Sequence, residues 1–232
     1  NSSGVVVLPV YNEGGTVGSV LDAVRGVFSG TVIVVDDGSA DGTPAVLAAR
    51  DDIQVIRHPV NAGYGRSLID GFAAALAAGA GAVVTMDCDG QHEPAHIPQF
   101  FGALHDCDIA SGSRYLPESP VEGTAPPSRQ DVNRRVTAAI NAVTGWRITD
   151  AFCGFKAYRA EALRALRLTE PGYAMPLELW AEAYRAGLCV VELPVDRIYF
   201  DGDRSFGQDL DDPERRLAYY LRVWERSLAK EE

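Results

Sequence analysis

The sequence is poor in the residues that mark zinc proteins, disulfide-rich scaffolds and membrane proteins. It has 4 Cys and 4 His in 232 residues. The cysteines are too widely spaced for a zinc motif or a dense disulfide framework, so we expect free thiols in a reducing compartment. No run approaches the roughly 18 uncharged apolar residues of a membrane-spanning helix. With no signal-peptide pattern at the start, these features predict a cytoplasmic protein.

Positive charge is also scarce. The chain has 21 Lys and Arg against 32 Asp and Glu, a net charge of −11, which argues against nucleic acid as a partner. The imbalance is concentrated in residues 1–110, where four arginines face thirteen carboxylates, a net charge of −9. If this half binds an anionic ligand, a divalent cation is the expected means of offsetting its carboxylates.

Apolar segments of two kinds alternate in the first half of the chain. A continuous β-branched run, typical of a buried parallel strand, occurs at 5–10, and further strands are predicted at 31–35, 53–56, 82–86 and 108–111. Segments with helical spacing lie between them, at 13–28, 41–50, 67–78 and 97–104. This alternation predicts an α/β fold with a doubly wound, mainly parallel sheet.

The pattern changes after residue 110. Residues 116–128 hold four prolines and predict a loop. Helices are predicted at 132–143, 160–166 and 177–186, a strand at 189–195 and a polar loop at 202–207. The segment Asp211-Asp212-Pro213 predicts a helix start, and the residues after it form an apolar stripe: Leu217, Tyr220, Leu221, Trp224 and Leu228. We expect this amphipathic helix to dock on the domain.

Acidic pairs follow two of the predicted strands. Asp36 and Asp37 come after 31–35, and Asp87 and Asp89 come after 82–86. Each pair by itself is also compatible with an ordinary turn. However, ligands bind beyond the carboxyl ends of strands in open α/β sheets, and carboxylates there are costly unless paired or metal-bound. The Asp-x-Asp pair offers two hard oxygen ligands that suit Mg²⁺ or Mn²⁺.

Six ordered segments resemble the family 2 glycosyltransferases with the GT-A fold, and among them the dolichol- and polyprenol-phosphate sugar synthases. The segments are LPVYNE at 8–13, VVDDGSADGT at 34–43, NAGYGR at 61–66, MDCDGQHEP at 86–94, GSRY at 112–115 and DAFCGFKAY at 150–158. The resemblance extends from residue 5 to about residue 207. It implies a Rossmann-like, doubly wound, mainly parallel sheet with a mixed acceptor-side half.

The resemblance also implies roles for individual residues. The nucleotide-sugar site would comprise Pro9, Tyr11, Glu13, Asp37, Gly63 and Asp87, with Arg204 and Ser205 in a loop that closes over the diphosphate. The ligands of Mg²⁺ or Mn²⁺ would be Asp87, Asp89 and Gln91. The catalytic group would comprise Asp89, Arg114 near the transferred phosphate or the acceptor, and Asp150 near the acceptor.

The implied reaction is a single in-line displacement that inverts the anomeric carbon of a nucleotide sugar, with GDP-mannose or UDP-glucose as expected donors. A polyprenyl phosphate acceptor is already ionised and needs no base. A hydroxyl acceptor would need a carboxylate within hydrogen-bond reach, for which Asp150 is the first candidate and Glu178 the second. Arg129 and Arg134, which follow the proline-rich segment, favour the phosphorylated acceptor.

Three other functions stay open from the sequence. The same donor could serve a small soluble hydroxyl acceptor in envelope or natural-product biosynthesis. A nucleotidyltransferase is disfavoured, because residues 9–15 contain Glu13 and no basic residue. A non-catalytic sugar-nucleotide binder is disfavoured by the presence of Asp89, Gln91, Arg114 and Asp150 together.

The expected organisation is a single domain over 1–232. Its parts would be a nucleotide-sugar-binding half at 1–110, an acceptor-binding half at 111–210 and a C-terminal amphipathic helix at 211–232. No Gln-x-x-Arg-Trp segment occurs, which argues against processive polymerisation. A lipid-linked acceptor would bring the protein to the inner face of the membrane as a peripheral partner, and the oligomeric state is left open.

Overall fold

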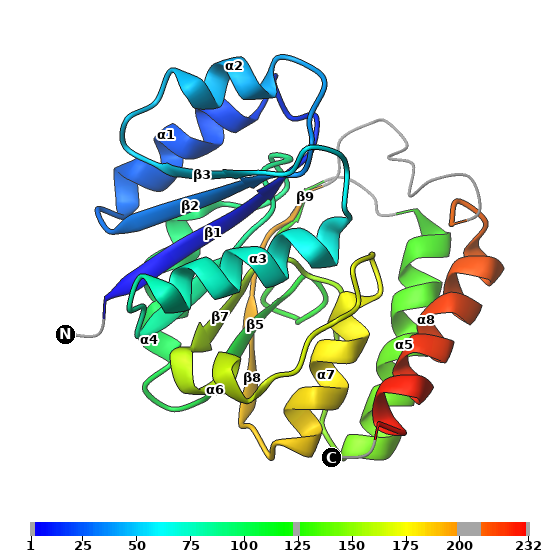
Figure 1. The fold of residues 1–232 in the computed structure, drawn as a ribbon. Helices are drawn as coiled ribbons and strands as arrows, with labels where there is room; N and C mark the ends of the chain where they lie inside the picture. The colour runs from blue at the N-terminus through cyan, green and yellow to red at the C-terminus, as the bar shows by residue number, and fades with distance from the viewer. Residues whose placement is uncertain (1–2, 123–125, 199–209, 231–232) are drawn as a thin grey trace.

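A seven-stranded sheet forms the centre of the molecule. The computed structural model describes residues 3–122, 126–198 and 210–230, and within them the strand order is β3-β2-β1-β4-β7-β5-β8 (Figure 1). The strands are β1 (Gly4–Val10), β2 (Thr31–Asp36), β3 (Gln54–Arg57), β4 (Ala82–Thr85), β5 (Ile109–Ser113), β7 (Lys156–Arg159) and β8 (Val190–Pro194). β7 runs antiparallel to both neighbours, whereas the other pairings are parallel. The predicted α/β fold with a mainly parallel sheet is confirmed.

Helices cover both faces of this sheet. They are α1 (Val17–Val27), α2 (Thr43–Ala48), α3 (Tyr64–Ala77), α4 (Ile97–Ala103), α5 (Pro127–Thr144), α6 (Ala160–Ala165), α7 (Met175–Arg185) and α8 (Pro213–Leu228). A short 3₁₀ turn, η1 (Pro94–His96), precedes α4, and two-residue strands β6 (Val121–Glu122) and β9 (Arg197–Ile198) pair separately. Side chains alternate along β1: Val7 packs in one core cluster with α3, α5, α7 and α8, and Leu8 in the other with α1 and α4.

The strand β7 is absent from the sequence prediction. Its four residues, Lys-Ala-Tyr-Arg, have charged ends and lack the aliphatic run that indicates a buried strand. In the structure it fills the space between β4 and β5, with Val84 opposite Ala157 and Ala110 also opposite Ala157. The motif at 150–158 is therefore a structural element of the sheet as well as a site segment.

Two helices begin three or more residues earlier than predicted. α5 begins at Pro127, inside the segment expected to be a loop, because proline is well tolerated in the first turn of a helix. α3 begins at Tyr64 instead of residue 67, directly after Gly63. Gly63 has a φ of 108°, a conformation that glycine adopts without strain. Both corrections move helix N-termini toward the same end of the sheet.

The C-terminal helix α8 packs on the rest of the molecule. It begins at Pro213, and the carboxylate of Asp212 accepts a hydrogen bond from the Arg215 amide at 2.8 Å. Leu217, Tyr220 and Trp224 of the predicted stripe are buried in the core cluster shared with α5 and α7, and α8 runs beside α5 in Figure 1. Across residues 3–122, 126–198 and 210–230, no helix has the length and apolarity to cross a bilayer.

Candidate active site

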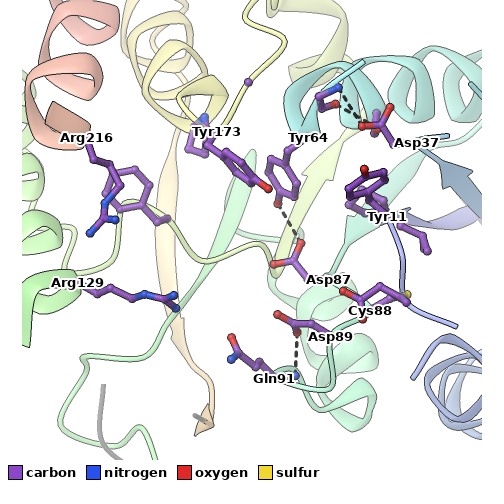
Figure 2. A pocket seen from close by; sticks show the side chains of 18 of the residues that line it. Tyr11, Asp37, Tyr64, Asp87, Cys88, Asp89, Gln91, Arg129, Tyr173 and Arg216 are labelled. Carbon is purple, nitrogen blue, oxygen red and sulfur yellow. Dashed lines mark hydrogen bonds between the residues drawn. The ribbon is translucent and has the colours of Figure 1, made fainter. Parts of the chain in front are cut away.

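A cavity of about 490 Å³ lies beyond the carboxyl ends of β1, β2 and β4 (Figure 2). Its volume is in the usual range for a small-ligand site, and its position is the one expected for ligands of an open α/β sheet. Many of the residues predicted from sequence line it: Pro9, Tyr11, Glu13, Asp37, Gly63, Asp87, Asp89, Gln91, Arg114 and Arg129. The fold brings them together from both halves of the chain, while their individual roles stay predictions.

Asp37, at the end of β2, organises the loop that leads into α3. Its Oδ1 accepts a hydrogen bond from the Ala62 amide at 2.8 Å, and its Oδ2 accepts one from the Gly63 amide at 2.9 Å. The ring of His58 bridges two carboxylates, with Nδ1 2.7 Å from Asp37 Oδ1 and Nε2 3.0 Å from Asp70 Oδ2. This partly buried network fixes the loop that forms one wall of the cavity.

The acidic turn after β4 also lines the cavity. Asp87 Oδ1 accepts a hydrogen bond from the Tyr64 hydroxyl at 3.1 Å, and its Oδ2 is 3.3 Å from His92 Nε2. Burial and the nearby Asp87 charge raise the pKa of Tyr64 well above its ordinary value, so its hydroxyl stays protonated and donates. Asp89 Oδ1 accepts from the Gln91 amide at 2.9 Å, which holds the turn closed.

The backbone of the motif at 150–158 packs directly against this turn. A Cβ atom on Gly154 would lie 2.3 Å from Asp87 Oδ2, so a larger residue would displace the carboxylate. Glycine is therefore required here because the chain approaches Asp87 closely.

The donor atoms around this turn fit a hard divalent cation that is shared with a substrate. Asp87, Asp89 and Gln91 present carboxylate and amide oxygens to one region of the cavity (Figure 2). The described part of the chain contains no cluster of three or more His, Cys, Asp or Glu side chains that would form a metal cage. Mg²⁺ is commonly held by one or two carboxylates together with substrate phosphates. These three residues would hold a cation of that kind in cooperation with a diphosphate.

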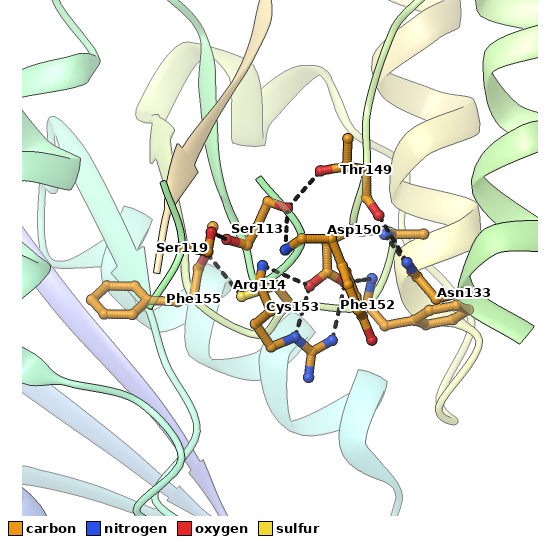
Figure 3. A network of polar contacts seen from close by, with 12 residues as sticks. Ser113, Arg114, Ser119, Asn133, Thr149, Asp150, Phe152, Cys153 and Phe155 are labelled. Carbon is orange, nitrogen blue, oxygen red and sulfur yellow. Dashed lines mark hydrogen bonds and ion pairs between the residues drawn. The ribbon is translucent and has the colours of Figure 1, made fainter. Parts of the chain in front are cut away.

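Arg114 and Asp150 form a buried ion pair at the cavity wall (Figure 3). Arg114 Nε lies 2.7 Å from Asp150 Oδ2 and Arg114 Nη2 lies 3.0 Å from Oδ1, with further bonds from the amides of Arg114 and Phe152. Burial alone would raise the pKa of Asp150, but the charge and hydrogen bonds of Arg114 hold it below its ordinary value. Asp150 is thus an ionised carboxylate that orients Arg114.

A second layer of polar contacts holds the segment that carries Asp150. Glu192 of β8 accepts hydrogen bonds from the amides of Thr149 and Asp150, each at 2.9 Å. Asn133 of α5 accepts from the Ala151 amide at 3.0 Å and donates to the Thr149 carbonyl at 2.8 Å. The carboxylate of Asp150 is completely buried and is absent from the cavity lining. This geometry does not support the predicted contact of Asp150 with an acceptor.

Glu178 lies away from the cavity, contrary to its predicted place at the acceptor. It is fully buried on α7, where it accepts bonds from the amides of Thr169 and Glu170 at 2.7 Å each and pairs with Lys230. These contacts lower its pKa against the opposing effect of burial. Glu178 therefore ties the segment before α7 to the C-terminal end of α8.

Arg134 is not among the residues that line the cavity. The side chain of Arg134 is 75% exposed on α5, where it pairs with Asp131, so it faces away from the site. Arg204 and Ser205, expected over the diphosphate, lie outside the described residues.

Several cavity residues have no counterpart in the sequence prediction. Tyr173 stacks on Tyr64, with ring centroids 5.9 Å apart and planes inclined by 18°. Arg216 and Tyr220 enter the cavity from α8. These two residues are four apart, so the helical spacing of the predicted stripe already places Arg216 on the face of Tyr220. No local pattern indicates Tyr173, which is contributed by a loop.

Solved structures share this architecture. Glucosyl-3-phosphoglycerate synthase from Mycobacterium tuberculosis in complex with UDP matches with a TM-score of 0.76 and 23% identity, over 100% of this chain and 82% of that chain. A complex of the same synthase with Mn²⁺, UDP and glucosyl-3-phosphoglycerate gives a TM-score of 0.75 and 22% identity. The fold is therefore that of the GT-A glycosyltransferases.

Sequence comparison shows to which glycosyltransferase family the chain belongs. Residues 5–167 match the model described as "Glycosyl transferase family 2", and the chain belongs to this family of enzymes. An undecaprenyl-phosphate mannosyltransferase from Micrococcus luteus is 32% identical over 199 residues, 82% of each chain. A polyprenol monophosphomannose synthase from Mycolicibacterium smegmatis is 32% identical over 201 residues, 82% of this chain and 76% of its own length.

Proposed function

We propose that this enzyme transfers a hexose from a nucleotide sugar to a polyprenyl phosphate with the help of a divalent cation. The observation that carries the proposal is the division of charge within the cavity. Carboxylates of Asp87 and Asp89 lie on one side, and the arginines Arg129 and Arg216 lie on the other (Figure 2). The two relatives named for transfer to polyprenyl phosphates, each aligned over 82% of this chain, support the same acceptor.

The acidic side suits the donor. We assign the nucleotide to the wall around Tyr11, Glu13 and Asp37, and its diphosphate to the turn that carries Asp87 and Asp89. When bound there, Mg²⁺ or Mn²⁺ would neutralise the diphosphate and stabilise it as a leaving group. The M. tuberculosis synthase, which shares the fold, was crystallised with Mn²⁺ and UDP. GDP-mannose and UDP-glucose are the donors to try first.

The arginine side suits an acceptor that is already ionised. A phosphate monoester needs no general base to attack the anomeric carbon, whereas a hydroxyl does. The carboxylate expected to serve as that base, Asp150, is buried and engaged on both oxygens by Arg114. Held in this way, Arg114 would contact the leaving diphosphate or the attacking phosphate through charge-assisted hydrogen bonds. The proposed reaction is one in-line displacement with inversion.

Donor binding can be tested by thermal shift with GDP-, UDP-, dTDP- and CDP-sugars, each with Mn²⁺ and with EDTA. We expect one nucleotide to raise the melting temperature only with Mn²⁺, because a ligand that binds the folded state stabilises it. Asp89→Asn should lose this shift, and Asp51→Asn, which removes an exposed carboxylate, should keep it. Transfer of the radiolabelled sugar to undecaprenyl phosphate then tests the acceptor. Folded protein that responds to no nucleotide sugar would contradict the proposal.

A lipid-linked acceptor implies contact with a membrane surface. We propose peripheral association at its inner face. The polar side of α8 carries both signs of charge, including Arg222 and Glu225. We therefore expect the protein to bind vesicles weakly, and anionic lipid alone to increase that binding only slightly. Flotation with vesicles of phosphatidylglycerol, with and without undecaprenyl phosphate, measures this. Equal recovery in both preparations would argue against acceptor-directed association.

A further inference from the structure

Arg216 is an unusual residue for the first turns of a surface helix. It is only 4% exposed, and the carboxylates of Asp211 and Asp212 at the start of its helix lie close enough to interact with its charge. Its Nη1 donates to the Leu210 carbonyl at 2.9 Å, which fixes the side chain at the start of α8. From there it reaches the cavity lining.

A second arginine faces the same space from another helix. Arg129, in the first turn of α5, also lines the cavity, and Figure 2 shows the two side chains on the same side of it. Burial and the like charge of Arg129 both lower the pKa of Arg216, while Asp211 and Asp212 at the helix start act in the opposite direction. Two guanidinium groups brought together in this way form a site for an anion.

Apolar side chains border this arginine pair. Phe152 and Tyr220 lie with ring centroids 4.7 Å apart, and both line the cavity. Val132 of α5 and Pro176 of α7 extend the same wall. A ligand that places an anionic group between the arginines would therefore place its adjoining atoms against carbon.

We propose that Arg216 holds the phosphate of the acceptor together with Arg129, and that the wall of Phe152 and Tyr220 receives the first apolar carbons of the same acceptor. The inference rests on the proposed function and assigns part of the acceptor site to α8. Arg216 is a substrate-binding residue in this scheme, and α8 is a wall of the active site as well as a structural helix.

The test is steady-state transfer to farnesyl phosphate, a short prenyl phosphate, by Arg216→Gln. The KM for farnesyl phosphate should rise roughly tenfold to a hundredfold, the range expected for a lost hydrogen bond to a charged group. The KM for the nucleotide sugar should stay unchanged. Arg222→Gln removes the same charge from an exposed position on α8 and should leave both constants unchanged. A purely structural role of Arg216 would not separate the two KM values.

A double-mutant cycle measures whether Arg129 and Arg216 act on the same phosphate. If both bind one phosphate, the combined loss in Arg129→Gln/Arg216→Gln should differ from the product of the single losses. Should Arg216→Gln fail to fold, Arg216→Lys replaces it in the assay, because a lysine keeps the charge but loses the planar fork of donors. A folded Arg216 variant with an unchanged KM for farnesyl phosphate would overturn this inference and leave the proposed function standing.

The choice of acceptors separates this inference from the proposed function. Wild-type protein that transfers sugar to no phosphorylated acceptor would overturn both. A second outcome is transfer to 3-phosphoglycerate that depends on Arg216, with no transfer to farnesyl phosphate. It would support the arginine pair as a phosphate site and overturn the proposal that the phosphate belongs to a lipid. Transfer to farnesol equal to that with farnesyl phosphate would overturn the phosphate contact.

Discussion

Asp150 is buried beneath the cavity wall, and both of its oxygens are occupied by Arg114. The pair keeps the charge of Asp150 compensated in a place that water does not reach, while Arg114 extends to the cavity lining. Removing one partner leaves the other charge buried, which is costly. The ion pair therefore couples the stability of the fold to the placement of Arg114 in the site.

Asp150→Asn should lower the free energy of unfolding by about 3–5 kcal/mol at pH 7. Because the folded pKa of Asp150 lies below its ordinary value of 3.8, its contribution is complete above that value and is lost as the pH falls through the folded pKa. Urea unfolding of both proteins at pH 7 and pH 3 should show the gap narrowing in acid. Asp131→Asn, which breaks an exposed pair with Arg134, should cost under about 1 kcal/mol. An equal gap at both pH values would contradict this account.

His58 bridges Asp37 and Asp70, and Asp37 belongs to the cavity wall to which we assign the nucleotide. His58→Gln can keep one of these contacts but cannot span both, so we expect the loop of Ala62 and Gly63 to loosen. The KM for the nucleotide sugar should rise several-fold while kcat changes little, because the lost contact affects binding and not the reacting atoms. His105→Gln, at an exposed position, is the control. A fall in kcat at constant KM would argue against a positioning role.

For single residues, the sequence predicts which side chains line the site better than it predicts which residues they contact. The motifs place Asp37, Asp87 and Asp89 at strand ends, and the structure brings them to one cavity. They also mark Asp150 as functional, but its neighbour Arg114 is 36 residues away, so no local spacing reveals that the carboxylate is already paired. The apolar stripe of α8 predicts packing on the domain, and it does not indicate that Arg216 reaches the cavity.

Among the elements, the N-terminus of α3 makes a close backbone contact with the segment before α7. The Arg66 amide donates to the Pro171 carbonyl at 3.0 Å. A Cβ atom on Gly65 would lie 2.3 Å from the Glu170 carbonyl oxygen and 2.6 Å from the Met175 Cβ. Glu170 in turn accepts a hydrogen bond from the Tyr219 hydroxyl at 2.6 Å. The helices α3, α7 and α8 are thereby locked around one edge of the cavity.

Gly65→Ala should destabilise the protein by about 1–3 kcal/mol, because the added methyl group has no room. Gly26→Ala offers a matched change on α1, where a Cβ atom meets nothing within 4 Å, and should stabilise it by about 0.5–1 kcal/mol. Urea unfolding measures both. Two variants with the same sign of effect would contradict the packing described for α3.

Element boundaries show where sequence patterns stop being informative. The aliphatic strands are found within one or two residues, because burial on both faces leaves a continuous apolar run. The start of α5 is missed, since prolines at 126 and 127 are equally compatible with a loop or a first helical turn. β7 is missed because its place in the sheet depends on β4 and β5, which lie far away in sequence.

At the scale of the whole molecule, the two predicted halves are interleaved. β7, from the second half, sits between β4 and β5. A fragment of residues 1–110 would leave the far side of β4 unpaired and remove the helices α5, α7 and α8 from one core cluster. We expect this fragment to show no cooperative thermal transition by circular dichroism, in contrast to the full chain. A sharp transition near that of the full chain would contradict the interleaving as a source of stability.

Because of the same topology, β4 is synthesised several seconds before its partner strand β7. Thr85 pairs with Lys156, about 70 residues later, so ribosomes adding about 5–20 residues per second expose the edge of β4 for roughly 4–14 s. An open strand edge invites pairing with another nascent chain. The surplus of nine carboxylates in residues 1–110 makes neighbouring chains repel one another during that interval. The acidity for which the proposed function calls on a cation would thus also keep the unfinished half of the chain from aggregating.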